Sequence, residues 1–114
     1  MKRGVVVLAR FPFTDLKASK RRPAVVVSQE GGVRDDVIVA FITSVIPDEL
    51  SDTDFMMHSG LDDFKDSGLT RPSVIKADKI ATLNSSVLSG ELGHLSKGAM
   101  KEIDRCLKKA LGLT

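Results

Sequence analysis

Three runs of β-branched and other apolar residues in the first 43 positions restrict the fold of this chain most. The first run, GVVVLA, spans positions 4–9, the second follows Pro23, and the third, DVIVAFIT, spans positions 36–43. Runs of this length and composition favour buried strands over helices. Pro12 ends the first run because proline cannot donate to a strand ladder, and Gly31-Gly32 breaks the second. The sequence therefore predicts three short strands before residue 44.

The second half of the chain predicts further strands and one helix. Positions 54–59, DFMMHS, can form a strand, and positions 61–68 can hold one helical turn. Positions 72–84 predict either two short strands, PSVIKAD and KIATLN, or one long bent strand. Ser96 is a favourable N-cap for a helix over 97–111, and Gly112 is a favourable stop. Apolar residues recur in this helix at spacings of three and four, which predicts one buried face.

These elements predict a mainly β fold with α structure. Several short strands and one closing helix fit a small, strongly curved sheet or partial barrel. A chain of 114 residues fits one domain, 1–114, and it contains no repeat or linker.

Charge is distributed unevenly along a chain whose net charge is only +2. Basic residues concentrate at 17–22 and 97–109, and acidic residues at 48–66. Lys20, Arg21 and Arg22 lie directly before Pro23 and its buried strand, so we expect Arg22 to be held in place. Guanidinium groups match phosphate oxygens, so this cluster suits a polyanion, although a solvated charge run has the same composition.

Two other polar features also allow two interpretations. Thr43-Ser44 ends the third predicted strand, where the hydroxyls can donate to an anion or form a local turn motif. One face of the predicted helix carries cations that suit an acidic partner, an RNA or plain solvation: Lys97, Lys101, Arg105 and Lys108.

Several kinds of site are not indicated. His58 and His94 are far apart and Cys106 is alone, so no ligand pair has zinc spacing. The acidic group at 62–66 lacks the spacing of an EF-hand, and the chain has no phosphate-binding glycine motif or nucleophile elbow. We therefore expect no metal and no cofactor. A single cysteine fits a reducing compartment, and no apolar run approaches the ~20 residues of a membrane span, so we expect a cytoplasmic protein that makes no membrane contact.

Three motifs in register resemble the PemK/MazF-like toxin family of bacterial toxin–antitoxin systems. The motifs are RGVVVLARFPFTDLKASKRRPAVVVSQ, VIVAFITS and GLTRPSVIKADKIATLNSSVLSGELGHLS, which together span most of the chain. The resemblance implies an SH3-like barrel that is usually a homodimer. It also implies metal-independent cleavage of single-stranded RNA to 2′,3′-cyclic phosphate and 5′-hydroxyl ends, and inhibition by a cognate antitoxin with an acidic segment.

The resemblance also implies site residues. Arg22 and Thr43 match the catalytic pair of such toxins, and Ser44 matches a neighbouring position that contacts substrate. Lys76 and Asp78 match a basic and an acidic position implicated in some members. Arginine is a poor base, so Asp78 is the expected general base. We expect Lys20, Arg21, Ser44 and Lys76 to bind RNA.

The chain departs from the family pattern at two places. Val5 stands where many members carry an acidic residue, and the loop Leu16–Lys20 offers lysines where many members have an acid or histidine. Two other functions therefore remain as alternatives: a non-catalytic toxin of the same fold that binds a protein such as DNA gyrase, and a harmless RNA-binding barrel. Against the former, residues 111–114 lack an aromatic tip.

Overall fold

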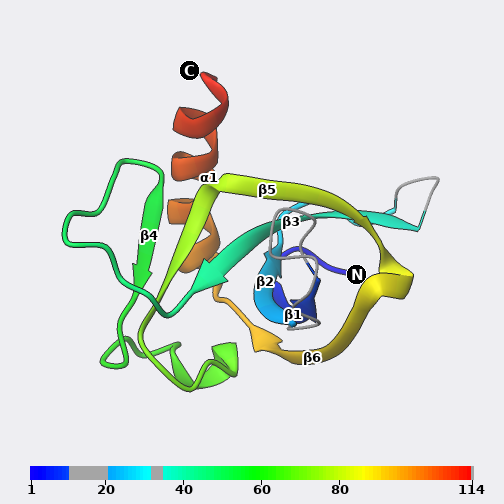
Figure 1. Ribbon diagram of the computed structural model, residues 1–114, viewed down its shortest axis with the longest axis horizontal. Helices are drawn as coiled ribbons and strands as arrows, with labels where there is room; N and C mark the ends of the chain where they lie inside the picture. Colours follow the sequence, from blue (N-terminus) through cyan, green and yellow to red (C-terminus); the bar gives the residue numbers. More distant parts are fainter. Residues whose placement is uncertain (11–20, 32–34, 114) are drawn as a thin grey trace.

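The fold is built on a six-stranded antiparallel sheet that curves strongly around its own axis (Figure 1). The computed structural model describes residues 1–10, 21–31 and 35–113. Its strands are β1 (Val5–Ala9), β2 (Arg22–Val26), β3 (Asp36–Thr43), β4 (Asp54–Met57), β5 (Ser73–Asn84) and β6 (Leu88–His94). They lie in the order β4-β5-β3-β2-β1-β6, so β4 and β6 are the two edges and the sheet does not close.

The long strand β5 sets the curvature of the sheet. Its first half pairs with both β3 and β4, and its second half continues along β3 alone. The register shifts between Phe41, which pairs with Lys76, and Ala40, which pairs with Ile80. Three residues of β5 therefore bulge between these pairs, and bulges of this kind bend a strand and increase its twist.

Apolar residues form a core cluster on each face of the curved sheet. Alternation along β3 directs Ala40 and Ile42 to one core cluster, and Val39 and Phe41 to the other. Helix α1 (Lys97–Leu111) covers the first cluster with Ala99, Met100 and Ile103, and it packs on β4 and β5. Cys106 lies on the buried face of this helix, and burial raises the pKa of its thiol.

The structure confirms the predicted mainly β fold with a C-terminal helix. The third strand and the helix have the predicted bounds, and the Ser96 hydroxyl accepts the Ala99 N–H as an N-cap. Positions 73–84 form one long strand rather than two short ones. The helical turn expected within 61–68 is a short 3₁₀ helix, η1 (Lys65–Ser67).

No local pattern in the sequence predicts β6. Its residues, LSGELGH, include two glycines and no β-branched residue, so propensity alone does not favour a strand. Pairing with β1 overrides that weak propensity, with two register shifts along the ladder.

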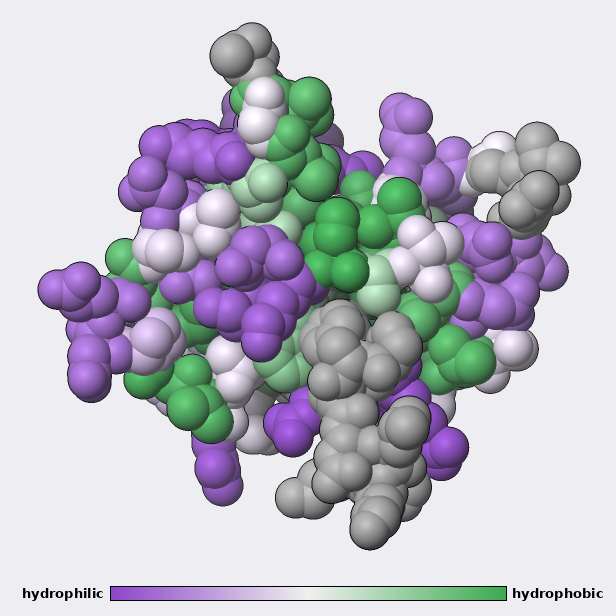
Figure 2. Space-filling model, turned by 45° about the horizontal axis from the view of Figure 1, so that its top comes forward, coloured by the Kyte–Doolittle hydropathy of each residue, from purple (hydrophilic) through white to green (hydrophobic). Residues whose placement is uncertain are grey.

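Acidic side chains concentrate on the connection between β3 and β4. Asp48, Glu49 and Asp52 are all exposed there, and Figure 2 shows hydrophilic side chains over this side of the molecule. Among the described residues, no helix has the length and apolar character needed to span a membrane.

Candidate functional site

A cavity of about 290 Å³ lies where β2 begins and β3 ends. The ladder between these strands pairs Ala24 with Phe41 and Val25 with Ala40. Continuing that register by two residues places Arg22 opposite Thr43, and both residues line the cavity. The structure therefore brings together the two residues that the sequence predicted as a catalytic pair. The described residues that line the cavity are Arg22, Pro23, Ile42, Thr43, Ser44, Leu69, Thr70, Arg71 and Ser73.

Arg22 is positioned at the start of β2 by an aromatic ring. It is the first residue of β2 and half-buried, and its guanidinium carbon lies 5.9 Å from the centre of the Phe41 ring. The Lys79 ammonium, from the bulge of β5, lies at the same distance from that ring. Such cation–π contacts stabilise a charge without neutralising it. Arg22 is therefore positioned while keeping its positive charge.

Thr43 is oriented by the turn that follows β3. Its Oγ1 accepts a hydrogen bond from the Val45 N–H at 3.1 Å. The local turn motif expected at Thr43-Ser44 is therefore present at Thr43. It does not exclude the alternative, in which the hydroxyl donates to an anion. Because Oγ1 acts as an acceptor in the turn, its own hydrogen remains available to donate to an anion in the cavity.

The other residues predicted for the site are placed differently. Ser44 is exposed and lines the cavity, whereas Arg21 is exposed and is not part of the lining. Lys20 lies outside the described residues. Asp78 is exposed within the bulge of β5 and does not line the cavity, so its role as general base stays a prediction.

Lys76 is engaged in an ion pair inside the protein. It pairs with Asp54 across β4 and β5, with Nζ donating to Oδ1 at 3.1 Å, and the Asp54 side chain is only 3% exposed. Two opposing effects act on the pKa of the Asp54 carboxyl. Burial alone would raise it, but the hydrogen bonds from Ser51 and Lys76 and the positive charge of Lys76 together outweigh burial, so the pKa is lowered. An RNA contact by Lys76 would compete with this pair, and it stays a prediction.

We expect Lys76→Met to destabilise the fold at neutral pH. The change leaves the Asp54 carboxylate buried without its cation, which costs up to ~5 kcal/mol in fully buried pairs. Lys76 is 20% exposed, so we expect about 2 kcal/mol from urea unfolding. Lys109→Met is the matched control, because Lys109 forms an exposed ion pair with Asp52. Loss of this exposed pair should change the free energy of unfolding by less than about 0.5 kcal/mol.

The pH dependence identifies the carboxylate as the cause. In the native chain the lowered pKa of Asp54 adds stability above about pH 4, which is lost as the pH falls through the folded value. Without Lys76, burial acts with less opposition and the Asp54 pKa rises. The destabilisation of Lys76→Met should then shrink as the pH falls from 7 towards 4. A deficit that is constant over this range would contradict this explanation.

Three polar residues of the cavity were missed in the sequence. Thr70, Arg71 and Ser73 line it from the segment between η1 and β5. Thr70 and Arg71 lie in the stretch GLTRPSVIKAD, which resembles the toxin family, so the resemblance could have pointed to them. No local pattern, however, indicates that this segment approaches β2 and β3. With these residues, the described lining holds two guanidinium groups, four hydroxyls and no carboxylate or imidazole. Such a set of donors suits a phosphate-bearing ligand.

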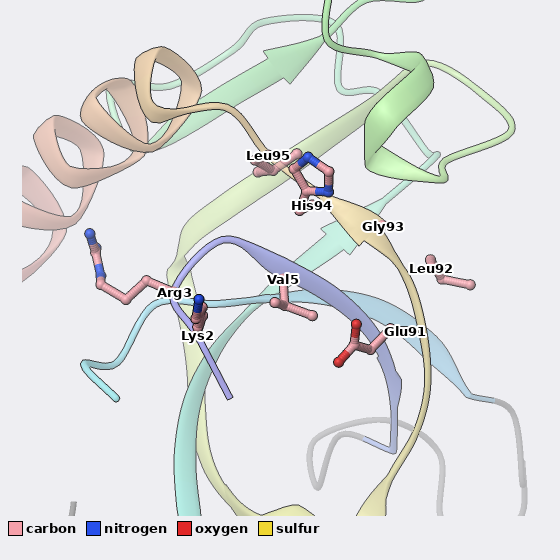
Figure 3. A pocket seen from close by; sticks show the side chains of 8 residues that line it. All are labelled: Lys2, Arg3, Val5, Glu91, Leu92, Gly93, His94 and Leu95. Carbon is pink, nitrogen blue, oxygen red and sulfur yellow. The ribbon is translucent and has the colours of Figure 1, made fainter. Parts of the chain in front are cut away.

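A larger hollow of about 460 Å³ lies elsewhere, between the N-terminal residues and β6. Arg3 extends from it towards α1, where it pairs with Asp104, and Glu91 points inward from β6 (Figure 3). None of the residues predicted for the site lines this hollow. Its charges are mixed, so its size alone does not make it the better candidate for an anionic ligand.

Solved structures of toxins share this fold. An endoribonuclease in complex with its cognate antitoxin, from a mycobacterial species, aligns with a TM-score of 0.78 and 23% identity over 100% of this chain and 97% of that one. A mycobacterial endoribonuclease aligns with a TM-score of 0.75 and 25% identity over 99% and 92%. Mycobacterium tuberculosis toxin MazF-mt6 aligns with a TM-score of 0.75 and 21% identity over 98% and 99%.

Sequence comparison identifies the family directly. No curated protein matches the chain. The sequence profile described as PemK-like, MazF-like toxin of type II toxin–antitoxin system matches residues 2–111, nearly the whole chain. This match and the shared fold confirm the resemblance seen in the motifs around Arg22, Thr43 and positions 68–96. The chain therefore belongs to the PemK-like, MazF-like toxin family of type II toxin–antitoxin systems.

Proposed function

We propose that this protein is a toxin that cuts single-stranded RNA without a metal ion and thereby arrests growth. The observation that carries the proposal is the position of Arg22 opposite Thr43 in one cavity that offers only positive charge and hydroxyl donors among its described polar lining. Membership of the toxin family and the fold shared with two mycobacterial endoribonucleases support it.

The proposed reaction uses the nucleophile that RNA itself provides. The 2′-oxygen attacks the neighbouring phosphorus and loses its proton, while the bond from phosphorus to the 5′-oxygen breaks and that oxygen is protonated. The products are a 2′,3′-cyclic phosphate and a 5′-hydroxyl. Arg22 and Thr43 would bind the phosphoryl oxygens as negative charge develops on them, which is a large source of catalysis in many enzymes. Asp78 remains the proposed base.

The proposal includes partners and a compartment. Two of the similar structures, one mycobacterial and one from Deinococcus radiodurans, hold a toxin together with its antitoxin. We propose a cognate antitoxin for this chain as well, and a homodimer as the active form. Lys20 and Arg21 would attract the RNA backbone ahead of the cavity. A single cysteine, Cys106, fits action in the reducing cytoplasm.

Incubation of the pure protein with a long RNA in EDTA tests this function. We expect discrete cuts that primer extension maps to one short motif. The 3′ fragments should accept phosphate from a kinase without prior dephosphorylation, because their 5′ ends are free hydroxyls. Intact RNA, or cleavage that requires an added metal, would contradict the proposal. Growth arrest with intact RNA and blocked DNA supercoiling would instead indicate a protein target such as gyrase.

A further inference from the structure

We propose that the cavity contains a second phosphate subsite, in which Arg71 binds an RNA phosphate next to the one that is cut. The inference rests on the proposed function and extends it from one phosphate to two. Arg22 and Thr43 line the cavity from strands β2 and β3, whereas Thr70 and Arg71 form the part of its wall that comes from the segment between η1 and β5. A substrate with a phosphate at every residue is the class of ligand that would meet both parts of the wall.

The wall that carries Arg71 is anchored by a contact between two backbones. Gly68 has a φ of 75°, and a Cβ at this position would lie 2.0 Å from the carbonyl oxygen of Leu92 in β6. Gly93, the next residue in β6, packs equally closely in return, since its Cβ would lie 2.1 Å from the Asp66 carbonyl oxygen. The segment before Arg71 is therefore fixed on the sheet.

Local hydrogen bonds continue this order up to the cavity. The fully buried Ser67 donates from Oγ to the Phe64 carbonyl at 2.5 Å and accepts the Leu69 N–H at 3.1 Å. Ser73 Oγ donates to the Arg71 carbonyl at 2.9 Å, on the far side of Pro72, whose ring fixes its own φ. The backbone at Arg71 is thus held from both sides, and an arginine on such a backbone is positioned before its ligand arrives.

Among the described residues, nothing neutralises the two guanidinium groups that line the cavity. Within residues 1–10, 21–31 and 35–113, no hydrogen bond or ion pair engages the Arg71 guanidinium, and the lining holds no carboxylate. In the part of the chain that the structure describes, Arg22 contacts the Phe41 ring and no carboxylate. Two cations beside one cavity repel each other until anions arrive, so the arrangement favours a ligand with more than one negative charge.

Salt dependence of binding tests the subsite. The probe is a single-stranded RNA oligonucleotide that carries a mapped cleavage site and 2′-O-methyl groups, so that it binds without being cut. Each phosphate contact on a single strand contributes about −0.7 to the slope of log K against log salt. We expect Arg71→Ala to reduce the slope by about 0.7, so its deficit in affinity should shrink about 2.6-fold between 50 and 200 mM salt. Arg71→Lys should keep the slope and bind several-fold more weakly than wild type.

Lys65→Ala is the matched control, because Lys65 is an exposed cation of the same connection that does not line the cavity. We expect it to bind as the wild type does. Arg71 is exposed, so thermal unfolding of Arg71→Ala should be unchanged. Parallel salt lines for wild type and Arg71→Ala would overturn the subsite. Failure of the wild type to cut or bind RNA would instead overturn the proposed function.

Discussion

Replacing Arg22 by alanine should lower kcat for RNA cleavage on the order of 10³-fold, because it removes the cavity's most constrained cation. The guanidinium is positioned by β2 and by the Phe41 ring before the substrate binds, so no energy is spent in orienting it during the reaction. Removing one such preorganised donor usually affects the transition state more than substrate binding. Single-turnover cleavage with saturating enzyme measures the chemical step directly.

Arg21→Ala is the matched control for this experiment. Arg21 is the neighbouring cation, but it is exposed and does not line the cavity. We expect it to raise KM by less than about tenfold at low salt, with kcat nearly unchanged, since a rim charge acts mainly on encounter. Arg22→Lys should recover only part of the loss, because an ammonium cannot bind two oxygens as a fork. Equal kcat values for Arg22→Ala and wild type would rule out the assignment of Arg22.

Gly68→Ala should destabilise the fold more than any other single change considered for this chain. The added methyl group meets the Leu92 backbone at 2.0 Å, where no flexible side chain can move aside. Overpacking of this kind costs about 1–3 kcal/mol, and an alanine at positive φ adds about 1 kcal/mol or more. We expect a loss of about 3–4 kcal/mol in urea unfolding, which is a large part of the stability of a small domain.

Gly90→Ala separates the two contributions. Gly90 has nearly the same conformation, with a φ of 72°, but a Cβ there meets nothing within 4 Å. It should therefore lose only about 1 kcal/mol, from the backbone conformation alone. Equal losses for the two variants would show that the contact between η1 and β6 does not anchor this segment.

Much of the fold could be predicted because it follows from local chemistry. The apolar run at 36–43 alternates with the period of a strand, and Ser96 and Gly112 mark the two ends of the helix. The proposed catalytic pair, Arg22 and Thr43, was predicted through resemblance, and the ladder between β2 and β3 then explains why residues 21 positions apart share one cavity. That part of the site depends on a single hairpin-like pairing, whose register the apolar pattern specifies.

The rest depends on contacts between distant segments, which local patterns do not specify. Strand β6 forms because β1 offers it a partner, although its own composition is unfavourable. Arg71 reaches the cavity because Gly68 and Gly93 allow two backbones to touch. In the same way, the sequence around Lys76 suggests an RNA-binding residue. Only the pairing of β4 with β5 shows that Lys76 forms an ion pair with Asp54.

The position of β1 between β2 and β6 has a consequence for a growing polypeptide on the ribosome. Residues 22–43 can pair as soon as they emerge, but β1 lacks its second neighbour until residues 88–94 have been made. The same late strand anchors the wall that completes the cavity. Pairings between such distant segments also form slowly. We therefore expect that a nascent chain cannot cleave the mRNA that encodes it until translation is nearly finished.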